Sequence, residues 1–130
     1  MKTETFHKQE RIVSRKQIET LFSGGTSQSL SAFPLRVVFM TQALSPGEAP
    51  VQILISVPKK HFKHAVDRNL VKRQVREAYR KNKQGLLQAM ESHEKEGLVV
   101  SFIWLENKLH DSHSVEHHIV ELLRHISERL

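Results

Sequence analysis

Residues 55–80 read ISVPKKHFKHAVDRNLVKRQVREAYR, a stretch that joins the end of a strand to a basic turn and a helix. β-Branched residues predict a strand over residues 51–57, and Pro58 closes it because proline cannot donate to a sheet ladder. Residues 65–82 contain no Gly or Pro and include good helix formers, which predicts a helix of about four turns. The chain therefore passes from a strand through a lysine-rich turn directly into a helix.

The predicted helix has one cationic face and one apolar face. At about 100° per residue, its cationic and amide side chains gather within about 140°; they are Arg68, Asn69, Lys72, Arg73, Arg76 and Arg80. The side expected to dock on the protein holds Val66, Leu70, Val71, Val75 and Ala78. Like charges four residues apart destabilise an isolated helix, each pair by about 0.2–0.5 kcal/mol. Such a row favours a bound polyanion over a merely solvated face, because phosphates would neutralise it.

The positive charge of the chain is concentrated in the same region. Residues 59–83 hold ten Lys or Arg and two acids, a net charge of +8, whereas the rest of the chain holds ten bases and twelve acids, a net charge of −2. This clustering is typical of a nucleic-acid-binding surface. A DNA-binding helix-turn-helix would need another helix just before this one, where a strand is predicted. RNA is therefore the favoured polyanion.

Length and composition limit the other possibilities. The 130 residues are expected to form a single domain, residues 1–130, with residues 1–10 flexible. The chain has no cysteine, which excludes disulfides, a thiolate nucleophile and sulfur-ligated zinc, and fits a cytoplasmic location. It also has no secretory signal and no run of about 18 apolar residues, so neither export by that route nor a membrane span is expected.

A short helix is predicted near the start of the chain, over residues 14–22. Its apolar residues recur at helical spacing, Ser14 can serve as the N-cap, and Gly24–Gly25 ends the run. Residues 26–32 are polar and predict a loop.

A strand is predicted over residues 33–40, which are rich in β-branched and aromatic side chains. Residues 43–50 contain a Ser-Pro-Gly sequence and predict a turn. We therefore expect this strand to pair with the strand over residues 51–57 as an antiparallel hairpin.

The segment after the basic helix predicts one more strand and one more helix. Residues 85–96 are expected to form a polar or weakly helical connection, and residues 98–105 a nearly continuous apolar strand. Residues 111–130 predict an amphipathic helix that covers the sheet. Its apolar stripe consists of Val115, Ile119, Leu122, Leu123 and Ile126. The element order is α-β-β-α-β-α, which predicts an α+β fold, a sandwich of helices on a small central sheet.

Residues 55–80 resemble the signature of the bacterial ribonuclease P protein family. In that family a strand ending in Ser-Val-x-Lys-Lys leads to Ala-Val-x-Arg-Asn-Arg-x-Lys-Arg-x-x-Arg-Glu, and residues 56–77 follow this order. Weaker similarity extends over almost the whole chain. The resemblance implies a fold like the second domain of a small-subunit ribosomal protein, with a left-handed β-α-β crossover in place of the usual right-handed one.

The function implied by the resemblance is that of a protein partner for a catalytic RNA. The RNA removes the 5′ leader from precursor tRNA and carries out the phosphodiester hydrolysis with bound magnesium ions, so no side chain here need be catalytic. The implied partners are the ribonuclease P catalytic RNA and precursor tRNA, with no membrane and no obligate protein partner. A non-catalytic RNA-binding module, for example a ribosome-associated one, is the alternative.

The resemblance also implies two groups of site residues. Contacts with the catalytic RNA are expected at Lys59, Lys60, Arg68, Asn69, Lys72, Arg73, Arg76 and Arg80. The leader-binding cleft, formed by the first helix and the sheet face, maps onto Arg11, Ile18, Phe22 and Arg36. This chain departs from the family pattern at Leu70, where a second arginine is usual. It also departs at Ile18, where an aromatic residue is common, which leaves base stacking mainly to Phe22.

Three other sequence patterns are weaker indications of a functional site. Residues 113–117 fit the H-x-x-E-H pattern of some zinc proteases, but a third ligand would have to come from elsewhere, and nine histidines make chance pairs common. Residues 23–27 are glycine-rich yet lack the Gly-Lys-Ser/Thr of a phosphate-binding loop. Trp104 lies in an apolar strand, where a core position is favoured over base stacking.

Overall fold

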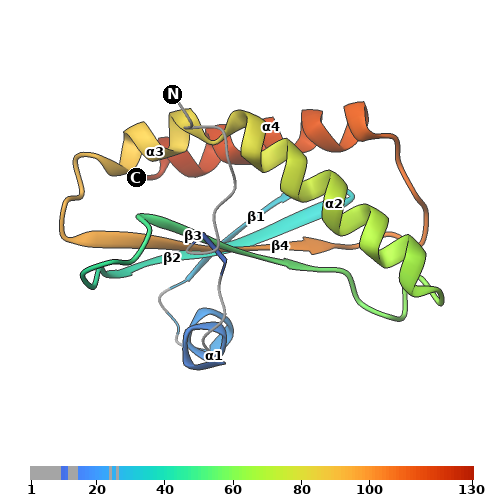
Figure 1. Cartoon of the computed structure of the whole chain (residues 1–130), viewed down its shortest axis with the longest axis horizontal. Coiled ribbons are helices and arrows are strands. Elements are labelled where there is room, and N and C mark those ends of the chain that lie inside the picture. Colours follow the sequence, from blue (N-terminus) through green and yellow to red (C-terminus); the bar gives the residue numbers. More distant parts are fainter. Residues whose placement is uncertain (1–9, 12–14, 24, 26) are drawn as a thin grey trace.

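In the computed structural model, which describes residues 10–11, 15–23, 25 and 27–130, a four-stranded sheet separates two layers of helices (Figure 1). The elements are α1 (Arg15–Ser23), β1 (Gln28–Ala32), β2 (Leu35–Ala43), β3 (Val51–Ser56), α2 (Ala65–Asn82), α3 (Gln84–Met90), β4 (Glu96–Trp104) and α4 (Ser112–Glu128). Helices α2, α3 and α4 lie on one face of the sheet, and α1 lies on the other. The predicted α+β sandwich is confirmed, with one strand and one helix more than expected.

The strand order of the sheet is β1-β2-β4-β3, with β4 antiparallel to β2 and parallel to β3. The prediction that β2 and β3 form a hairpin is therefore wrong, because β4 lies between them. Most residues of β4 are buried, on both faces of the sheet. A strand that is apolar on both faces buries most surface in a central position. The parallel pair β3 and β4 needs a crossover connection, which α2 and α3 supply.

The first strand falls within residues 26–32, where the sequence predicted a loop. Residues 28–32 pair antiparallel with β2, and Leu30 and Ala32 pack against the main core. Because β1 is an edge strand, these two apolar side chains are enough to hold it, and Ser29 and Ser31, which alternate with them, are exposed. The first part of the polar or weakly helical connection predicted over residues 85–96 is α3, which buries Leu86 and Met90.

The main core lies between the sheet and α2, α3 and α4. All five residues of the apolar stripe predicted for the last helix are buried in it, as is Trp104, so both predictions are confirmed. A smaller cluster on the opposite face joins Leu21 of α1 to residues of β2 and β4; its strand members are Val38, Met40 and Val99. Ser14, Gly24 and residues 1–9 lie outside the described residues, and with them the predicted N-cap and most of the segment expected to be flexible. Within the described part of the chain, no helix has the length and apolar character needed to cross a membrane.

Candidate RNA-binding surface

Helix α2 begins after a turn, residues 57–64, that follows β3. His64 occupies the N-cap position and makes no side-chain capping hydrogen bond. Arg68 fastens the turn instead, because its Nη1 donates to the carbonyl oxygens of Phe62 at 2.7 Å and Lys63 at 3.2 Å. A guanidinium has five N–H donors, so these two bonds leave others for a phosphate. The turn that carries Lys59 and Lys60 is thereby held against the start of α2.

The inner side of α2 docks on the sheet and on α4. Its buried residues are Val71, Gln74, Val75, Ala78 and Tyr79. Gln74 donates from Nε2 to the carbonyl oxygen of His110 at 2.9 Å, which ties α2 to the loop before α4. The predicted docking side is confirmed for three residues, whereas Leu70 is only half-buried and Val66 is 76% exposed. Val66 lies in the first turn of α2, which carries no buried residue. The predicted helix is therefore right, but the predicted burial of Val66 is wrong.

The outer side of α2 carries the predicted cations, and none of them is buried. Asn69 and Arg73 are exposed, and Lys72, Arg76 and Arg80 are half-buried along the same helix. Arg80 forms an ion pair with Glu77, with its Nη2 at 2.9 Å from Oε1 and its Nε at 3.1 Å from Oε2. The hydrogen bond from Arg80 holds the pKa of Glu77 below its ordinary value, so Glu77 stays charged and offsets part of the charge of Arg80. The charge of the cationic row is therefore partly offset at its Arg80 end.

Three of the four residues expected to bind the leader lie on or around α1, on the other face of the sheet from α2 (Figure 1). Ile18 packs against the smaller core cluster, while Phe22 is 51% exposed. Arg36 is exposed on β2 and points to the same face, where its Nε donates to the Ser29 hydroxyl at 2.9 Å. Arg11 lies elsewhere, at the edge of the sheet, where it forms a parallel bridge with Ile53 of β3. The structure thus brings three of these residues to one face and separates the fourth.

A buried ion pair was not predicted from the sequence. Lys83, between α2 and α3, is 2% exposed, and its Nζ lies 2.8 Å and 3.0 Å from the two carboxylate oxygens of Glu10. The pair joins residues 73 positions apart, and no local pattern signals such a contact. Lys83 is one of the ten Lys or Arg in residues 59–83, but because it is buried it is not on a surface available to RNA.

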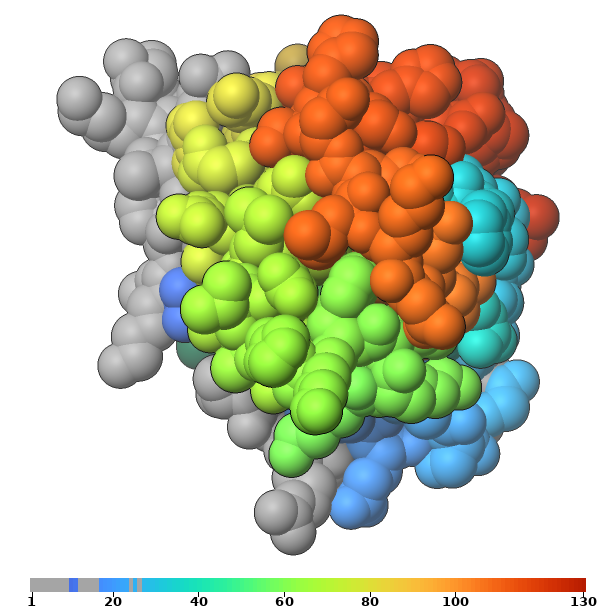
Figure 2. Space-filling model, turned by 90° about the vertical axis from the view of Figure 1, so that its right-hand side faces the viewer, coloured from blue at the N-terminus to red at the C-terminus, as the bar shows by residue number. Residues whose placement is uncertain are grey.

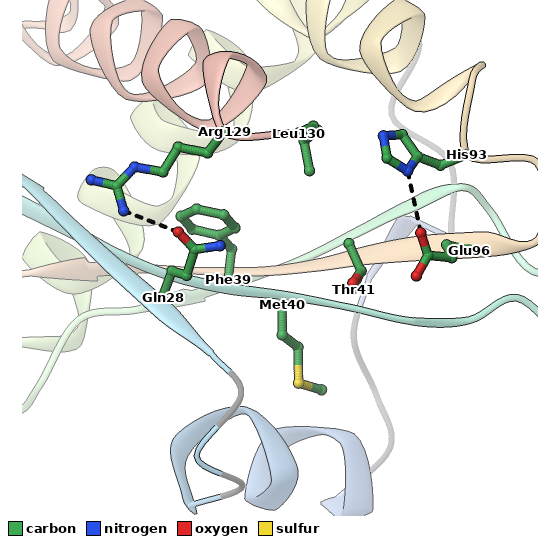
Figure 3. A pocket seen from close by; sticks show the side chains of 8 residues that line it. All are labelled: Gln28, Phe39, Met40, Thr41, His93, Glu96, Arg129 and Leu130. Carbon is green, nitrogen blue, oxygen red and sulfur yellow. Dashed lines mark hydrogen bonds and ion pairs between the residues drawn. The ribbon is translucent and has the colours of Figure 1, made fainter.

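Two further polar features lie on α4 and at its C-terminal end. His113 and His117 both lie on α4, and in the described residues no group of three or more His, Cys, Asp or Glu side chains could hold a metal ion. A hollow of about 200 Å³ lies between the sheet and the end of α4 (Figure 3). Its charged side chains contact neighbours: Arg129 donates to Gln28 at 3.0 Å, and His93 lies 3.2 Å from Glu96.

An α+β sandwich with an arginine-rich helix on its outer surface defines a class of polyanion-binding domain. A family model described as Ribonuclease P matches residues 6–126. The ribonuclease P protein component of Porphyromonas gingivalis is 38% identical over 109 residues, which cover 84% of this chain and 77% of that protein. That of Chlorobium phaeobacteroides is 39% identical over 85 residues, which cover 63% of this chain and 56% of that protein.

Solved structures show the same fold. The RNase P protein from Thermotoga maritima matches with a TM-score of 0.68 at 24% identity, covering 89% of this chain and 96% of that one. A mutant RNase P protein from Staphylococcus aureus gives a TM-score of 0.67 at 18% identity, covering 93% of this chain and 90% of that one. This chain belongs to the ribonuclease P protein family. Membership implies a role in tRNA processing and association with the ribonuclease P RNA.

Proposed function

We propose that this chain is the protein subunit of a ribonuclease P holoenzyme that assists magnesium-dependent endonucleolytic removal of the 5′ leader from precursor tRNA. The outer side of α2, with Lys59 and Lys60 in the preceding turn, binds the catalytic RNA. The observation that carries this proposal is the two-sided character of α2: its inner side is buried while six Lys or Arg and two acids occupy the helix. A helix fixed in this way presents its cations without having to fold around the RNA.

The leader binds, in this proposal, to the face of the sheet that carries α1. Phe22 offers an exposed ring for a base to stack on, and Arg36 offers a cation on the same face. Ile18 supports α1 from beneath and contributes little to stacking, because it packs into the smaller core cluster. Arg11, at the edge of β3, would contact RNA that extends beyond this face.

The chemistry belongs to the RNA in this proposal. The magnesium ions of the holoenzyme are bound mainly by the RNA in this proposal. The protein contributes positive charge that offsets repulsion between phosphates of the RNA and of the substrate. It therefore acts by binding and positioning, in the cytoplasm where precursor tRNA is made.

The test is reconstitution of cleavage at low magnesium concentration. The purified chain is mixed with a bacterial ribonuclease P RNA and a 5′-labelled precursor tRNA, and leader release is followed on a gel. We expect the chain to raise the cleavage rate over RNA alone, because protein cations replace part of the magnesium requirement. Bovine serum albumin and the Arg73→Ala variant serve as controls for non-specific protein effects and for the proposed surface.

The alternative function gives a different result in the same experiment. A non-catalytic RNA-binding module would bind the RNA in a gel-shift assay without raising the cleavage rate. Binding without stimulation would therefore replace the holoenzyme proposal with that module. Absence of binding at low salt would contradict both.

A further inference from the structure

Three loops meet at one end of the sheet, where β3 and β4 end and β2 begins. The turn between β1 and β2 is held by the backbone N–H of Leu105, which donates to the carbonyl oxygen of Pro34 at 2.8 Å. The loop before α4 is held to the turn before α2 by a hydrogen bond of 2.6 Å between Asn107 and His61. The space-filling view from this end shows the loop before α2 in green, the loop before α4 in orange and the start of the sheet in cyan (Figure 2). These loops form one continuous surface that leads onto α2.

This surface combines exposed apolar side chains with lysines. Of the five large exposed apolar residues among the described positions, three belong to these loops or to the adjoining first turn of α2; they are Phe33, Val66 and Leu109. Four exposed lysines accompany them, at positions 59, 60, 63 and 108. Of the nearby acids, Glu106 contacts His110, Asp111 caps α4 by accepting from the Ser114 N–H at 2.7 Å, and Asp67 is half-buried in the first turn of α2. We call Phe33 and these four lysines the sheet-end surface.

Phe33 is the most unusual member of the sheet-end surface. Its side chain is 62% exposed at the turn between β1 and β2, on a backbone that the Leu105 hydrogen bond fixes to the central strand. Because this backbone is already ordered, a flat partner that covers the ring restricts only the side-chain rotation of Phe33. Nucleic-acid bases are flat partners, and exposed rings beside cations are how proteins bind single-stranded RNA. Among the described residues, the other phenylalanine with a strongly exposed ring is Phe22, which lies on α1 and not on these loops.

We propose that the sheet-end surface extends the RNA-binding surface of α2: an unpaired nucleotide stacks on Phe33, a phosphate next to it contacts Lys108, and phosphates further along the strand contact Lys59 and Lys60. This inference rests on the proposed function, because it takes the ligand of the neighbouring helix α2 to be RNA. It extends the RNA path from α2 around the end of the sheet, away from the face that carries α1. The lysines favour RNA over an apolar protein partner, which would not need them.

The test measures binding of a fluorescent single-stranded oligouridine of about 12 nucleotides by anisotropy. We expect Phe33→Ala to weaken binding roughly 5- to 100-fold, because base stacking on an aromatic ring is lost, and to leave the salt dependence unchanged. Phe33→Tyr keeps the ring and should bind like the unchanged protein. Phe33→Leu keeps an apolar side chain without the ring and should bind like Phe33→Ala. Lys108→Ala should lower the slope of log affinity against log salt by up to about 0.7.

Controls separate this inference from the function on which it rests. Phe33 is exposed, so the thermal unfolding midpoints of its variants should match that of the unchanged protein. Failure of the unchanged protein to bind a bacterial ribonuclease P RNA would contradict the proposed function itself. Loss of affinity in Arg73→Ala with none in Phe33→Ala would overturn the sheet-end site alone. Equal binding by Phe33→Leu and the unchanged protein would also overturn it, because the contact would then be apolar and not a stacked base.

Discussion

Helices α2 and α4 cover the same face of the sheet and pack against each other, yet their outer surfaces differ in charge (Figure 1). Residues 65–82 hold six Lys or Arg and two acids, a net charge of +4, whereas residues 112–128 hold one Arg and three Glu, a net charge of −2. Both helices bury an apolar stripe in the same core. The fold therefore dictates the inner side of each helix and leaves the outer side free, so the outer charge of α2 reports what it binds.

The largest effects, on stability, should come from substitutions on the buried inner sides of the two helices. Ile119→Ala in α4 should lower the free energy of unfolding by about 2–5 kcal/mol, because it leaves a cavity in the core. Val75→Ala in α2 removes fewer carbon atoms and should cost somewhat less. Urea denaturation followed by circular dichroism measures both changes. If either substitution left the free energy of unfolding unchanged, the two inner sides would not contribute to stability in the same way.

Substitutions on the outer sides of α2 and α4 should have a smaller effect, on RNA affinity alone, and this effect should differ between the two helices. Arg73→Ala in α2 should weaken binding to a bacterial ribonuclease P RNA roughly 5- to 30-fold at low salt, because a charge-assisted contact with phosphate is lost. Arg124→Ala is the matched control, because Arg124 is exposed on α4, where it contacts Glu128 at 3.3 Å. Filter binding at several salt concentrations measures both. Equal losses in the two variants would mean that the charge of α2 acts only through the net charge of the protein.

The smallest of the expected effects comes from adding a cation to α2. Leu70→Arg restores the arginine that the family usually has, and Asp67 three residues earlier can pair with it. Because Leu70 is half-buried, stability should change little, while the salt slope of RNA binding should rise by about 0.7–0.9. The same salt titration measures the slope. A large loss of stability with no change in slope would place position 70 in the core and not on the RNA surface.

The parts of the structure that depend on local pattern were predictable from the sequence. Residues 65–82 are helical as predicted, because Pro58 ends the strand and no Gly or Pro interrupts the helix. The apolar stripe of α4 is buried as its spacing indicates. Such patterns predict whether a segment is a helix or a strand, approximately where it begins and ends, and which of its sides is apolar.

The parts that depend on contacts between distant residues were not predictable. The pairing of β2 with β4 instead of β3 is decided by burial of the whole sheet, and the Glu10–Lys83 pair by the path of the chain. A helical wheel places Val66 on the docking side, because it does not show where the first turn of a helix lacks a neighbour. For the proposed RNA-binding surface, the cations of α2 were predictable from the sequence but Phe33 at the end of the sheet was not, since it has no motif around it.

The most direct test of the central claim locates the RNA on the folded protein without relying on affinity. The chain has no cysteine, so single changes can each carry one iron chelate that cleaves nearby RNA. Glu77→Cys on α2 and Glu128→Cys at the end of α4 are matched, because each removes one exposed carboxylate. With a bacterial ribonuclease P RNA bound, we expect strong and localised strand cleavage from position 77 and weak cleavage from position 128. Cleavage of equal strength from both positions, or stronger cleavage from position 128, would contradict the assignment of α2 as the RNA-binding helix.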